Sequence, residues 1–323
     1  MIATQIKAIT VDENDEHRLA IRTVDLVPAL QAEVTIRITA ISLNRGEVRR
    51  ALTTSLTGTR PGWDFAGIIE DTNGVTDAPP AGSRVAGLLA VGSWCELVHV
   101  PLGSIAMIPD GVSDAEAACI PLAGLTALHA IRKGGFLLGK KVLINGASGG
   151  VGQMAIQLAA LAGAVVYSHI RQEHHRILVE EASTGAVITG ATLDEAKSHG
   201  PFDFILDSLG GASLSAAMGM LKKNGTCITI GASDSATVTF DSNLLFFGSS
   251  GAALKSMNIF HEIAAAGSLA DDLEMLLGLV AKGKLKIKIG TEKKWTEISA
   301  VATALMERRF SGKAVLHLPG ALL

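Results

Sequence analysis

An apolar run leads into a glycine-rich turn at Lys141-Val142-Leu143-Ile144-Asn145-Gly146-Ala147-Ser148-Gly149-Gly150-Val151-Gly152. The amphipathic run 151–161 follows at once, so the stretch predicts a strand, a tight turn and a helix. A second apolar run at 164–167 begins about one helix later, as a βαβ unit requires. This setting favours a dinucleotide-binding turn over an ordinary glycine turn on a surface.

The turn has the small residues that allow a backbone to come close to a pyrophosphate. The free N–H groups and the positive dipole end of the following helix then face the negative charge of that group. The spacing Gly-x-Gly-x-x-Gly is met, except at its first position, on Ala147, Gly149 and Gly152. We therefore expect a pyrophosphate to be bound by Ala147, Ser148, Gly149, Gly150, Val151 and Gly152.

Length and charge narrow the class of protein. At 323 residues the chain exceeds one average domain, so two compact units are expected. The formal net charge of −3 is mild and the basic residues are scattered, which predicts neither nucleic-acid binding nor a polybasic membrane patch. The segment 1–16 is polar and acidic, and the apolar stretch 155–170 is broken by Gln157 and His169. We expect no export signal and no membrane span.

The cysteines, Cys95, Cys119 and Cys227, are far apart and form no CxxC motif or Cys/His cluster. Such usage fits small buried hydrophobic side chains in a reducing cytosol, so a cytoplasmic protein is expected. Cys95 and His99 lie four positions apart, but two ligands without a second pair are more typical of core packing than of a metal site.

The sequence pattern changes along the chain. From residue 7 to about 109, short apolar runs and turn residues predict a β-rich, barrel-like domain. A capped helix start at 113–116 and helical periodicity over 122–132 come next. Strands and helices then alternate, which calls for a parallel sheet with helices on both faces. The expected strands lie around Val142, Val165, 204–207, 227–230 and 244–248.

The tail predicts helices around 271–281 and 297–309 and a strand at 314–318. The expected architecture is therefore a β-rich domain built from both ends of the chain and interrupted by a nucleotide-binding α/β domain.

A series of short motifs accompanies the glycine turn: Leu43-Asn44-Arg45-Gly46-Glu47, Pro61-Gly62-Trp63-Asp64-Phe65-Ala66-Gly67, Gly82-Ser83-Arg84-Val85, Gly92-Ser93-Trp94-Cys95-Glu96, Gly124-Leu125-Thr126-Ala127, Asp207-Ser208-Leu209-Gly210-Gly211 and Gly312-Lys313-Ala314-Val315-Leu316. In this order they resemble the medium-chain dehydrogenase/reductase superfamily, specifically its zinc-free quinone oxidoreductase-like branch, nearly end to end. The resemblance implies a Rossmann domain with a doubly wound parallel sheet at 119–251, inserted into a β-rich GroES-like substrate domain at 1–118 and 252–323. It also implies a nicotinamide cofactor between the two domains and, usually, a homodimer.

The departures from the metal-using members of that superfamily concern the zinc ligands. Where those enzymes have Gly-His-Glu, this chain has Gly62-Trp63-Asp64, and Asn44 stands in the place of their ligand cysteine. The four-cysteine structural zinc loop is absent from the sequence too. Because an indole offers only a donor, Trp63 cannot bind a metal. We expect no metal, and without a Lewis acid the oxidation of an unactivated alcohol is disfavoured.

This reasoning favours a substrate that is already electrophilic. A quinone or an α,β-unsaturated ketone accepts hydride at a conjugated carbon, and fixed hydrogen-bond donors can stabilise the charge on its oxygen. The resemblance makes Asn44, Arg45 and Thr126 the candidate catalytic donors. The alternatives are that Asn44 holds a turn, that Arg45 is a solvated charge, and that Thr126 bonds back within its helix.

Tyrosine separates competing families. The chain has one tyrosine, Tyr167, and the residue four positions later is Arg171, so the Tyr-x-x-x-Lys pair of short-chain dehydrogenases cannot form. Superfamily members that reduce enoyl thioesters often use a tyrosine of the first domain as proton donor, and none is present there. A 2-enoyl thioester reductase is therefore the alternative activity, and a nucleotide-binding protein with little catalysis is the alternative class.

The residues after the second Rossmann strand bear on the choice of cofactor. NAD-specific domains place an acidic residue at the end of that strand to accept the ribose hydroxyls. In the segment 168–176 the one acid, Glu173, lies past the expected strand end. Ser168, Arg171, His175 and Arg176 offer donors for a 2′-phosphate instead, so NADPH is the expected cofactor. The alternative is a solvated helix start whose charges contact only water.

The resemblance adds further cofactor residues: Asp207, Gly231, Ala232, Phe246, Phe247, Gly248 and Lys313. The first three follow strands on the carboxyl side of the sheet, Phe246 to Gly248 would run past the nicotinamide, and Lys313 would reach the pyrophosphate. Turn-making and core packing remain alternatives for these residues, and an exposed position remains one for Lys313. The strand expected around 244–249 would pair with its copy across a dimer axis, since an apolar edge is otherwise an aggregation hazard.

Overall fold

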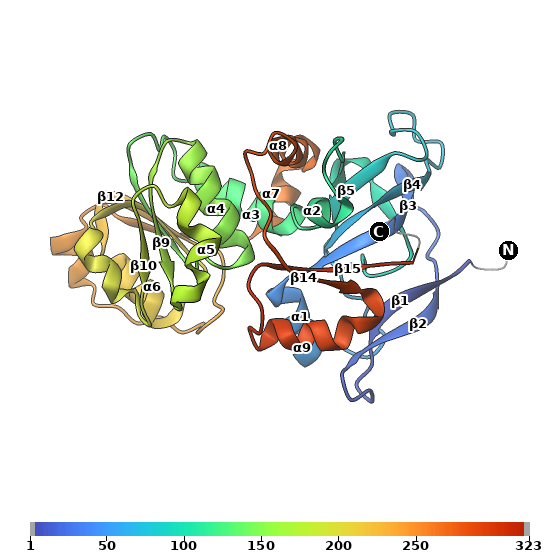
Figure 1. The fold of residues 1–323 in the computed structure, drawn as a ribbon, viewed down its shortest axis with the longest axis horizontal. Coiled ribbons are helices and arrows are strands. Elements are labelled where there is room, and N and C mark those ends of the chain that lie inside the picture. Colours follow the sequence, from blue (N-terminus) through green and yellow to red (C-terminus); the bar gives the residue numbers. More distant parts are fainter. Residues whose placement is uncertain (1–3, 320–323) are drawn as a thin grey trace. The chain divides into compact units, whose positions relative to one another are not determined.

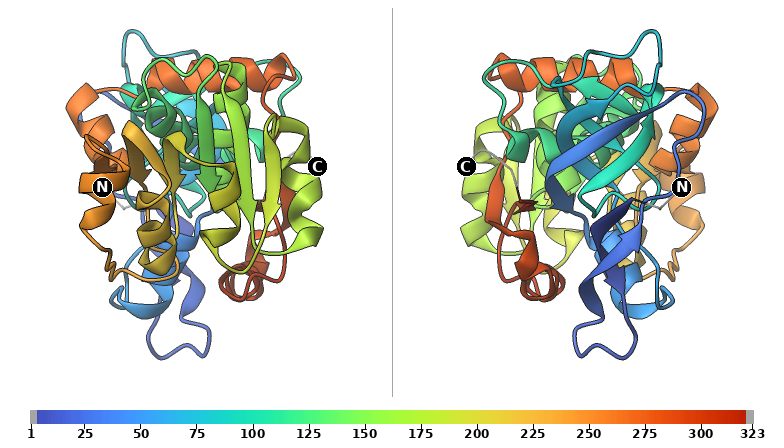
Figure 2. Two further views of the ribbon diagram at one scale, coloured as in Figure 1. Left: turned by 90° about the vertical axis from the view of Figure 1, so that its left-hand side faces the viewer. Right: turned by 90° about the vertical axis from the view of Figure 1, so that its right-hand side faces the viewer.

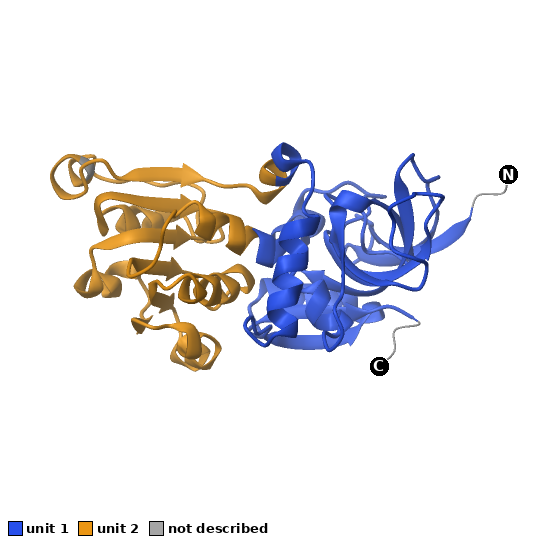
Figure 3. Ribbon diagram, turned by 90° about the horizontal axis from the view of Figure 1, so that it is seen from above, with its two compact units in different colours: residues 1–125, 263–323 blue, residues 126–262 orange. Residues whose placement is uncertain are grey.

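The computed structural model describes residues 4–319 and divides the chain into two compact units (Figures 1 and 3). Unit 1 comprises residues 1–125 and 263–323, and unit 2 comprises residues 126–262. The division passes through α3 (Pro121–Arg132) and α7 (Ile259–Ala266). The boundaries expected from the sequence, after residues 118 and 251, lie earlier in the chain. One unit is thus inserted into the other.

Unit 1 is built on a mainly antiparallel sheet in the order β14-β15-β3-β4-β5-β7, with β6 also paired to β3. A separate hairpin consists of β1 (Gln5–Val11) and β2 (Leu19–Asp25). The strands of the sheet are β3 (Glu33–Leu43), β4 (Asp64–Asp71), β5 (Arg84–Leu88), β6 (Leu97–Pro101), β7 (Ile105–Met107), β14 (Ile289–Lys294) and β15 (Lys313–His317). The helices are α1 (Arg45–Thr53), α2 (Asp114–Ala118), α8 (Ala270–Ala281) and α9 (Ile298–Met306), with short turns η1 (Leu102–Ser104) and η6 (Trp295–Glu297).

The core of unit 1 lies around β3, which pairs with β15, β4 and β6. Phe65 and Trp94 are fully buried there. Gly62 has φ +120°, and a Cβ at this position would clash with the side chain and the backbone of Trp94, so residue 62 has to be glycine. The predicted start of α2 is confirmed by the capping box that Ser113 forms with Glu116.

Unit 2 contains six parallel strands in the order β10-β9-β8-β11-β12-β13. The left view of Figure 2 shows strands of this unit side by side, coloured from green to gold. The strands of the sheet are β8 (Lys141–Asn145), β9 (Val165–Ile170), β10 (Ala186–Thr189), β11 (Phe202–Asp207), β12 (Leu221–Thr229) and β13 (Ala253–Ser256). The helical segments are α4 (Gly150–Leu161), η2 (Glu173–His175), α5 (Arg176–Val179), η3 (Glu180–Ala182), η4 (Leu193–His199), α6 (Gly211–Met218) and η5 (Leu244–Gly248).

The strand order reverses between β8 and β11. The crossover through α4 runs from β8 to β9, and the crossover through α6 runs the other way, from β11 to β12. Because parallel crossovers are right-handed, α4 and α6 cover opposite faces of the sheet. The predicted fold class, a doubly wound parallel sheet inserted into a β-rich domain, is confirmed.

One predicted strand is wrong. Residues 244–248 form a π-helix, η5, and the strand that completes the sheet is β13, with Thr226 to Thr229 of β12 beside it. A short apolar run fits a strand or a helix segment equally well, so local pattern alone could not separate them. Phe246 and Phe247 are 73% and 86% exposed on η5.

Within residues 4–319, no helix has both the length and the apolar composition that crossing a membrane requires.

Candidate functional site

The glycine turn after β8 has the geometry expected of a phosphate-binding turn. Gly146 has φ +82°, and the N–H of Ala147 donates to the carbonyl of His169 at the end of β9, at 3.1 Å. A Cβ at Gly152 would collide with the carbonyl oxygen of Gly146 and lie 2.7 Å from Cα of Ala147. The first turn of α4 thus rests directly on the loop, which only glycine at 152 permits.

Helix α4 begins beside this loop, with Gly149 as its N-cap at φ −73° and ψ 164°. The N–H groups of Gly150, Val151 and Gly152 belong to the first turn, where no intrahelical acceptor is available. The carbonyl of Ser148 accepts a hydrogen bond from Nε2 of Gln153 at 2.7 Å, which fixes the loop against the helix. This arrangement leaves backbone donors and the positive helix end for an anion.

A buried hydrogen-bond network joins the ends of three neighbouring strands beneath the turn. Nδ2 of Asn145 donates to Oδ1 of Asp207 at 2.6 Å, and Oδ1 of Asn145 lies 3.0 Å from Nδ1 of His169. Because an amide oxygen can only accept, Nδ1 of His169 carries the hydrogen. Oδ2 of Asp207 accepts from the N–H of Gly210, which has φ +73°. Asp207 is therefore placed where it holds the turn after β11.

Burial shifts the pKa of both ionisable members of this network. It raises the pKa of Asp207 and lowers that of His169, since each charged form loses solvation. Asn145 and His169 were not predicted as site residues. The feature of the sequence that could have identified them is a polar residue at the end of a buried strand.

The four residues expected to bind a 2′-phosphate differ in their burial and in the groups that they contact. Ser168 is fully buried, and its hydroxyl accepts a hydrogen bond from Ser183 at 2.6 Å. Nη2 of Arg171 lies 3.1 Å from Oδ1 of Asp234, with the arginine side chain 33% exposed. Arg176 forms an ion pair with Glu173.

The fourth of these residues, His175, packs edge-on against His174 with ring centroids 4.2 Å apart. Burial, and then the neighbouring His174, lower its pKa. Arg171 is the arginine that directly follows β9.

The loop after β12 returns toward the loop after β11. Gly231 and Ala232 lie in it, and the N–H of Ser233 donates to the carbonyl of Ser208 at 3.2 Å. Ser208 in turn donates from Oγ to the carbonyl of Asn145 at 3.1 Å. The glycine turn and the loops after β11 and β12 are thus gathered at the carboxyl edge of unit 2, where ligands of doubly wound sheets bind.

Lys313 is neither exposed nor in unit 2. It is 5% exposed within unit 1, and its Nζ lies 2.7 Å from Oδ1 of Asn44 and 3.4 Å from Oδ2 of Asp64. The strand β15 that carries it pairs with β3, which brings residue 313 next to residue 44. The alternative of an exposed lysine is wrong, and contact of Lys313 with a pyrophosphate stays a prediction.

Both amide hydrogens of Asn44 are directed at carboxylates. Nδ2 donates to Oε1 of Glu47 at 2.9 Å and to Oδ2 of Asp64 at 2.8 Å. The orientation of the amide is unambiguous, because Lys313 can only donate and the carboxylates accept. Oδ1 of Asp64 also accepts from the N–H of Leu122 at 2.7 Å. We call Asn44, Glu47, Asp64 and Lys313 the unit 1 polar cluster.

The charge of Lys313 acts on two carboxyl groups in the unit 1 polar cluster. Burial and the charge of Asp64 raise the pKa of Glu47 to about 8, so Glu47 is mostly protonated at neutral pH. Burial also raises the pKa of Asp64, and Lys313 opposes that shift. Glu47 and Asp64 were not predicted as functional residues, although both lie in the motifs that carry the resemblance.

The other two predicted donors lie on different elements. Nη1 of Arg45 lies 3.0 Å from the carbonyl of Met306 and 3.2 Å from that of Leu305, at the carboxyl end of α9. A cation is favourable there because the helix dipole is negative at that end. Thr126 is buried in the middle of α3, with 7% exposure.

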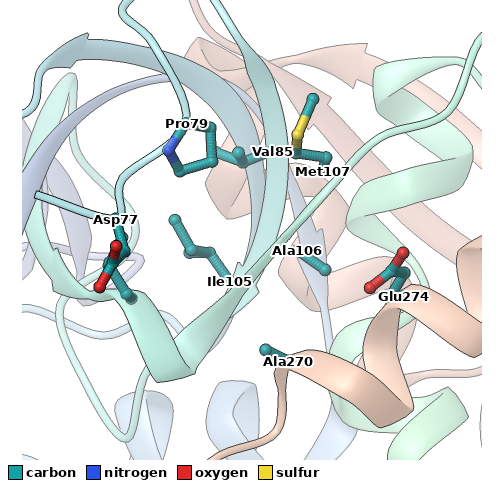
Figure 4. Close-up of a pocket in the computed structure, with 9 residues that line it drawn as sticks. Asp77, Pro79, Val85, Ile105, Ala106, Met107, Ala270 and Glu274 are labelled. Carbon is teal, nitrogen blue, oxygen red and sulfur yellow. The ribbon is translucent and has the colours of Figure 1, made fainter.

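A small pocket lies elsewhere in unit 1 (Figure 4). Its volume is about 180 Å³, and Ile105, Ala106 and Ala270 line it between the carboxylates of Asp77 and Glu274. Pockets for small-molecule ligands and cofactors are typically larger, roughly 300–1,000 Å³. None of the predicted site residues lines it.

Trp63 and Cys95, where no metal is expected, have surroundings that do not favour metal binding. Trp63 is 9% exposed, and the guanidinium carbon of Arg50 lies 5.6 Å from its ring centroid. Burial raises the pKa of Cys95 to about 12, which disfavours the thiolate. Over residues 4–319, no three His, Cys, Asp or Glu side chains are grouped to hold a metal ion.

Comparison with known proteins gives one family model, described as a zinc-binding dehydrogenase, which matches residues 150–271. A mycocerosic acid synthase-like polyketide synthase of Mycobacterium tuberculosis is 28% identical over 325 aligned residues, or 95% of this chain. The chain spans 15% of the length of that relative.

Solved structures share the fold. The quinone oxidoreductase from Coxiella burnetii matches with a TM-score of 0.79 and 22% identity, over 97% of this chain and 99% of the other. The CurK enoyl reductase matches with a TM-score of 0.82 and 23% identity, over 98% and 99%.

Proposed function

We propose an NADPH-dependent reductase of the medium-chain dehydrogenase/reductase superfamily. The family model over residues 150–271, the relatives and the shared fold support this proposal. The acceptor of this reductase is a quinone or an α,β-unsaturated carbonyl compound, and the reductase acts without zinc. The observation that carries the proposal is the glycine turn at the reversal point of the doubly wound sheet, with the first N–H groups of α4 beside it.

In this proposal unit 2 holds the cofactor. The backbone of Gly149 to Gly152 binds the pyrophosphate, and the network of Asn145, His169 and Asp207 keeps the turn in shape. Arg171 binds the 2′-phosphate, because it follows β9 where NAD-binding domains have an acidic residue. Bound NADPH supplies the hydride, while the protein supplies orientation and hydrogen bonds.

The oxygen of the substrate needs a hydrogen-bond donor while hydride is transferred to the conjugated carbon. We propose the hydroxyl of Thr126 for this role. Glu47 and Asp64 accept both amide hydrogens of Asn44. Asn44 can therefore donate to the substrate oxygen only by breaking one of these two hydrogen bonds. We therefore assign Asn44 a positioning role in the unit 1 polar cluster. Arg45 is assigned to the end of α9, not to the acceptor.

The zinc-free part of the proposal rests on Asn44 and Trp63, which stand where metal-using relatives have ligands. An indole cannot ligate a metal, and Asn44 is fully engaged with charged neighbours. Elemental analysis of the purified chain tests this point directly. We expect no stoichiometric zinc and full activity in chelator. One zinc per chain, or loss of activity that added metal restores, refutes the zinc-free reading.

A 2-enoyl thioester is the second candidate substrate. The observation that favours it is the 28% identity with a polyketide synthase, together with the shared fold of a structure named as an enoyl reductase. Comparing NADPH oxidation with an enone, a quinone and a crotonyl thioester decides between them. Stoichiometric NADPH binding with no oxidation by any of the three would instead indicate a nucleotide-binding protein with little catalysis.

We also propose a homodimer, with β13 in place of the wrongly predicted strand at 244–248. β13 is the last strand of the sheet and pairs on one side with β12. Leu254 of β13 is exposed, as are Phe246 and Phe247 in the preceding segment η5. Pairing of β13 with its copy would satisfy the open edge and cover these side chains. Light scattering that gives one chain per particle contradicts this assembly.

A further inference from the structure

An ion pair joins segments from two different parts of unit 2. Arg171 follows β9, and its Nη2 lies 3.1 Å from Oδ1 of Asp234. Asp234 stands in the loop after β12, and its N–H donates to the carbonyl of Leu209, in the loop after β11, at 2.9 Å. The ion pair therefore connects the end of β9 with the loops after β11 and β12.

The strand order places this ion pair across the end of β8. That strand lies between β9 and β11, so the connection bridges roughly 10 Å of sheet edge, two strand spacings. The glycine turn starts at the same end of β8. Ala147 bonds to His169 in β9, and Asn145 bonds to Ser208 in the loop after β11. Arg171 is thus held over the edge at which the dinucleotide is proposed to bind.

The ion pair can open without disturbing the sheet. Beneath it, the buried network of His169, Asn145 and Asp207 already fixes the three strand ends. The side chains of Arg171 and Asp234 are 33% and 50% exposed. Exposed ion pairs contribute little stability, so a stronger anion can replace the carboxylate at modest cost.

We propose that Asp234 is an internal competitor for the phosphate-binding arginine, holding Arg171 until a 2′-phosphate displaces it. This inference rests on the proposed NADPH role of Arg171 and adds a residue that sets cofactor affinity. A phosphate monoester carries up to two negative charges against one for the carboxylate, and it offers more acceptor oxygens. A ligand whose ribose has only hydroxyls cannot compete for the guanidinium in this way.

Arg176, a second arginine close to β9, is held apart from this exchange. Arg176 is paired with Glu173, whose Oε2 also accepts from Thr189 at 2.6 Å. Glu173 and Thr189 therefore lie at the ends of β9 and β10, and neither bridges β8. Asp234 is the carboxylate paired with Arg171.

Isothermal titration calorimetry of the full chain with adenosine 2′,5′-bisphosphate and with 5′-AMP tests the competition. We expect Asp234→Asn to lower the dissociation constant of the bisphosphate about two- to fivefold, the range for one exposed ion pair. The dissociation constant of 5′-AMP should change less than that. In an Arg171→Ala background, Asp234→Asn should have no effect on the bisphosphate.

Glu70→Gln is the matched control, because it removes the same charge from an exposed pair in unit 1. Nε of Arg37 lies 2.8 Å from Oε2 of Glu70, with side chains 39% and 49% exposed. This variant should bind both ligands like the wild type. An unchanged bisphosphate affinity in Asp234→Asn, equal gains for both ligands, or a gain that persists without Arg171 overturns the inference while leaving NADPH binding intact. A wild type that prefers 5′-AMP overturns the NADPH proposal as well.

Discussion

Nζ of Lys313 lies 2.7 Å from Oδ1 of Asn44, although the two residues are 269 positions apart in the chain. The contact orients the Asn44 amide so that both of its hydrogens face Glu47 and Asp64. The ammonium lies 3.4 Å from Asp64, so a buried cation and a buried anion offset each other inside unit 1. The first residue of β15 is therefore bound to the residue that precedes α1.

Removing the charge of Lys313 should destabilise unit 1 strongly. Lys313→Met leaves the buried carboxylate of Asp64 without its cation, and breaking a buried pair from one side costs about 3–5 kcal/mol. Trp63, Trp94 and Trp295, the three tryptophans of the chain, all lie in unit 1, so their fluorescence during urea unfolding reports on that unit. Adding Asp64→Asn to Lys313→Met should restore part of the loss. No difference between the single and double variants would show that the two charges are not coupled.

Glu47 should make the stability of unit 1 fall as the pH rises. Its pKa is about 8 in the folded chain against an ordinary value of 4.5, so the folded state holds the proton more tightly. The stabilisation is complete below about pH 4.5 and is lost as the pH rises through about 8. Glu47→Gln mimics the protonated acid without titrating. It should match the wild type near pH 4 and exceed it near pH 8, measured by tryptophan fluorescence in urea. Parallel curves for the two proteins would contradict the raised pKa.

Gly152→Ala should impair cofactor binding through the shape of the turn. The added Cβ would collide with the carbonyl of Gly146 and press on Cα of Ala147, so α4 has to move away from the loop. We expect at least a tenfold weaker NADPH affinity by fluorescence titration, equivalent to about 1.4 kcal/mol. Gly278→Ala in α8 is the control, because a Cβ there has no neighbour within 4 Å. Equal affinities for the Gly152→Ala variant and the control would remove the turn from the site.

Arg171→Ala should separate the two nicotinamide cofactors. Charge-assisted hydrogen bonds contribute about 1.5–3 kcal/mol, so NADPH binding should weaken by roughly ten- to a hundredfold. NADH has no 2′-phosphate to lose and should bind nearly as before. Titration of both cofactors to both proteins measures the difference, and equal losses would refute the assignment.

Local patterns predicted the parts of the fold that local forces determine. The strand, turn and helix at 141–161 follow from apolar runs and glycine spacing, and the capped start of α2 follows from Ser113 and Glu116. Residues 244–248 were assigned to a strand because a short apolar run looks the same in a strand and in a helix.

Contacts between residues far apart in the chain could not be predicted from the sequence. Pairing of β3 with β15 brings Lys313 next to Asn44, and no local sequence pattern around either residue predicts this contact. The ion pair of Arg171 with Asp234 similarly depends on a loop that folds back from β12 to β11. Ser168 was expected to face a ligand, but alternation along β9 buries it.

Hydride transfer from NADPH to a conjugated acceptor without a metal is tested most directly by single-turnover stopped-flow measurement of NADPH oxidation. An alcohol must lose a proton of high pKa as hydride leaves, whereas a conjugated acceptor needs only its oxygen stabilised. We predict oxidation of NADPH by a quinone or an enone in the presence of chelator, slowed by up to about a hundredfold in Thr126→Ala with little change in NADPH affinity. Faster turnover of a saturated alcohol than of every quinone and enone tested would contradict the account.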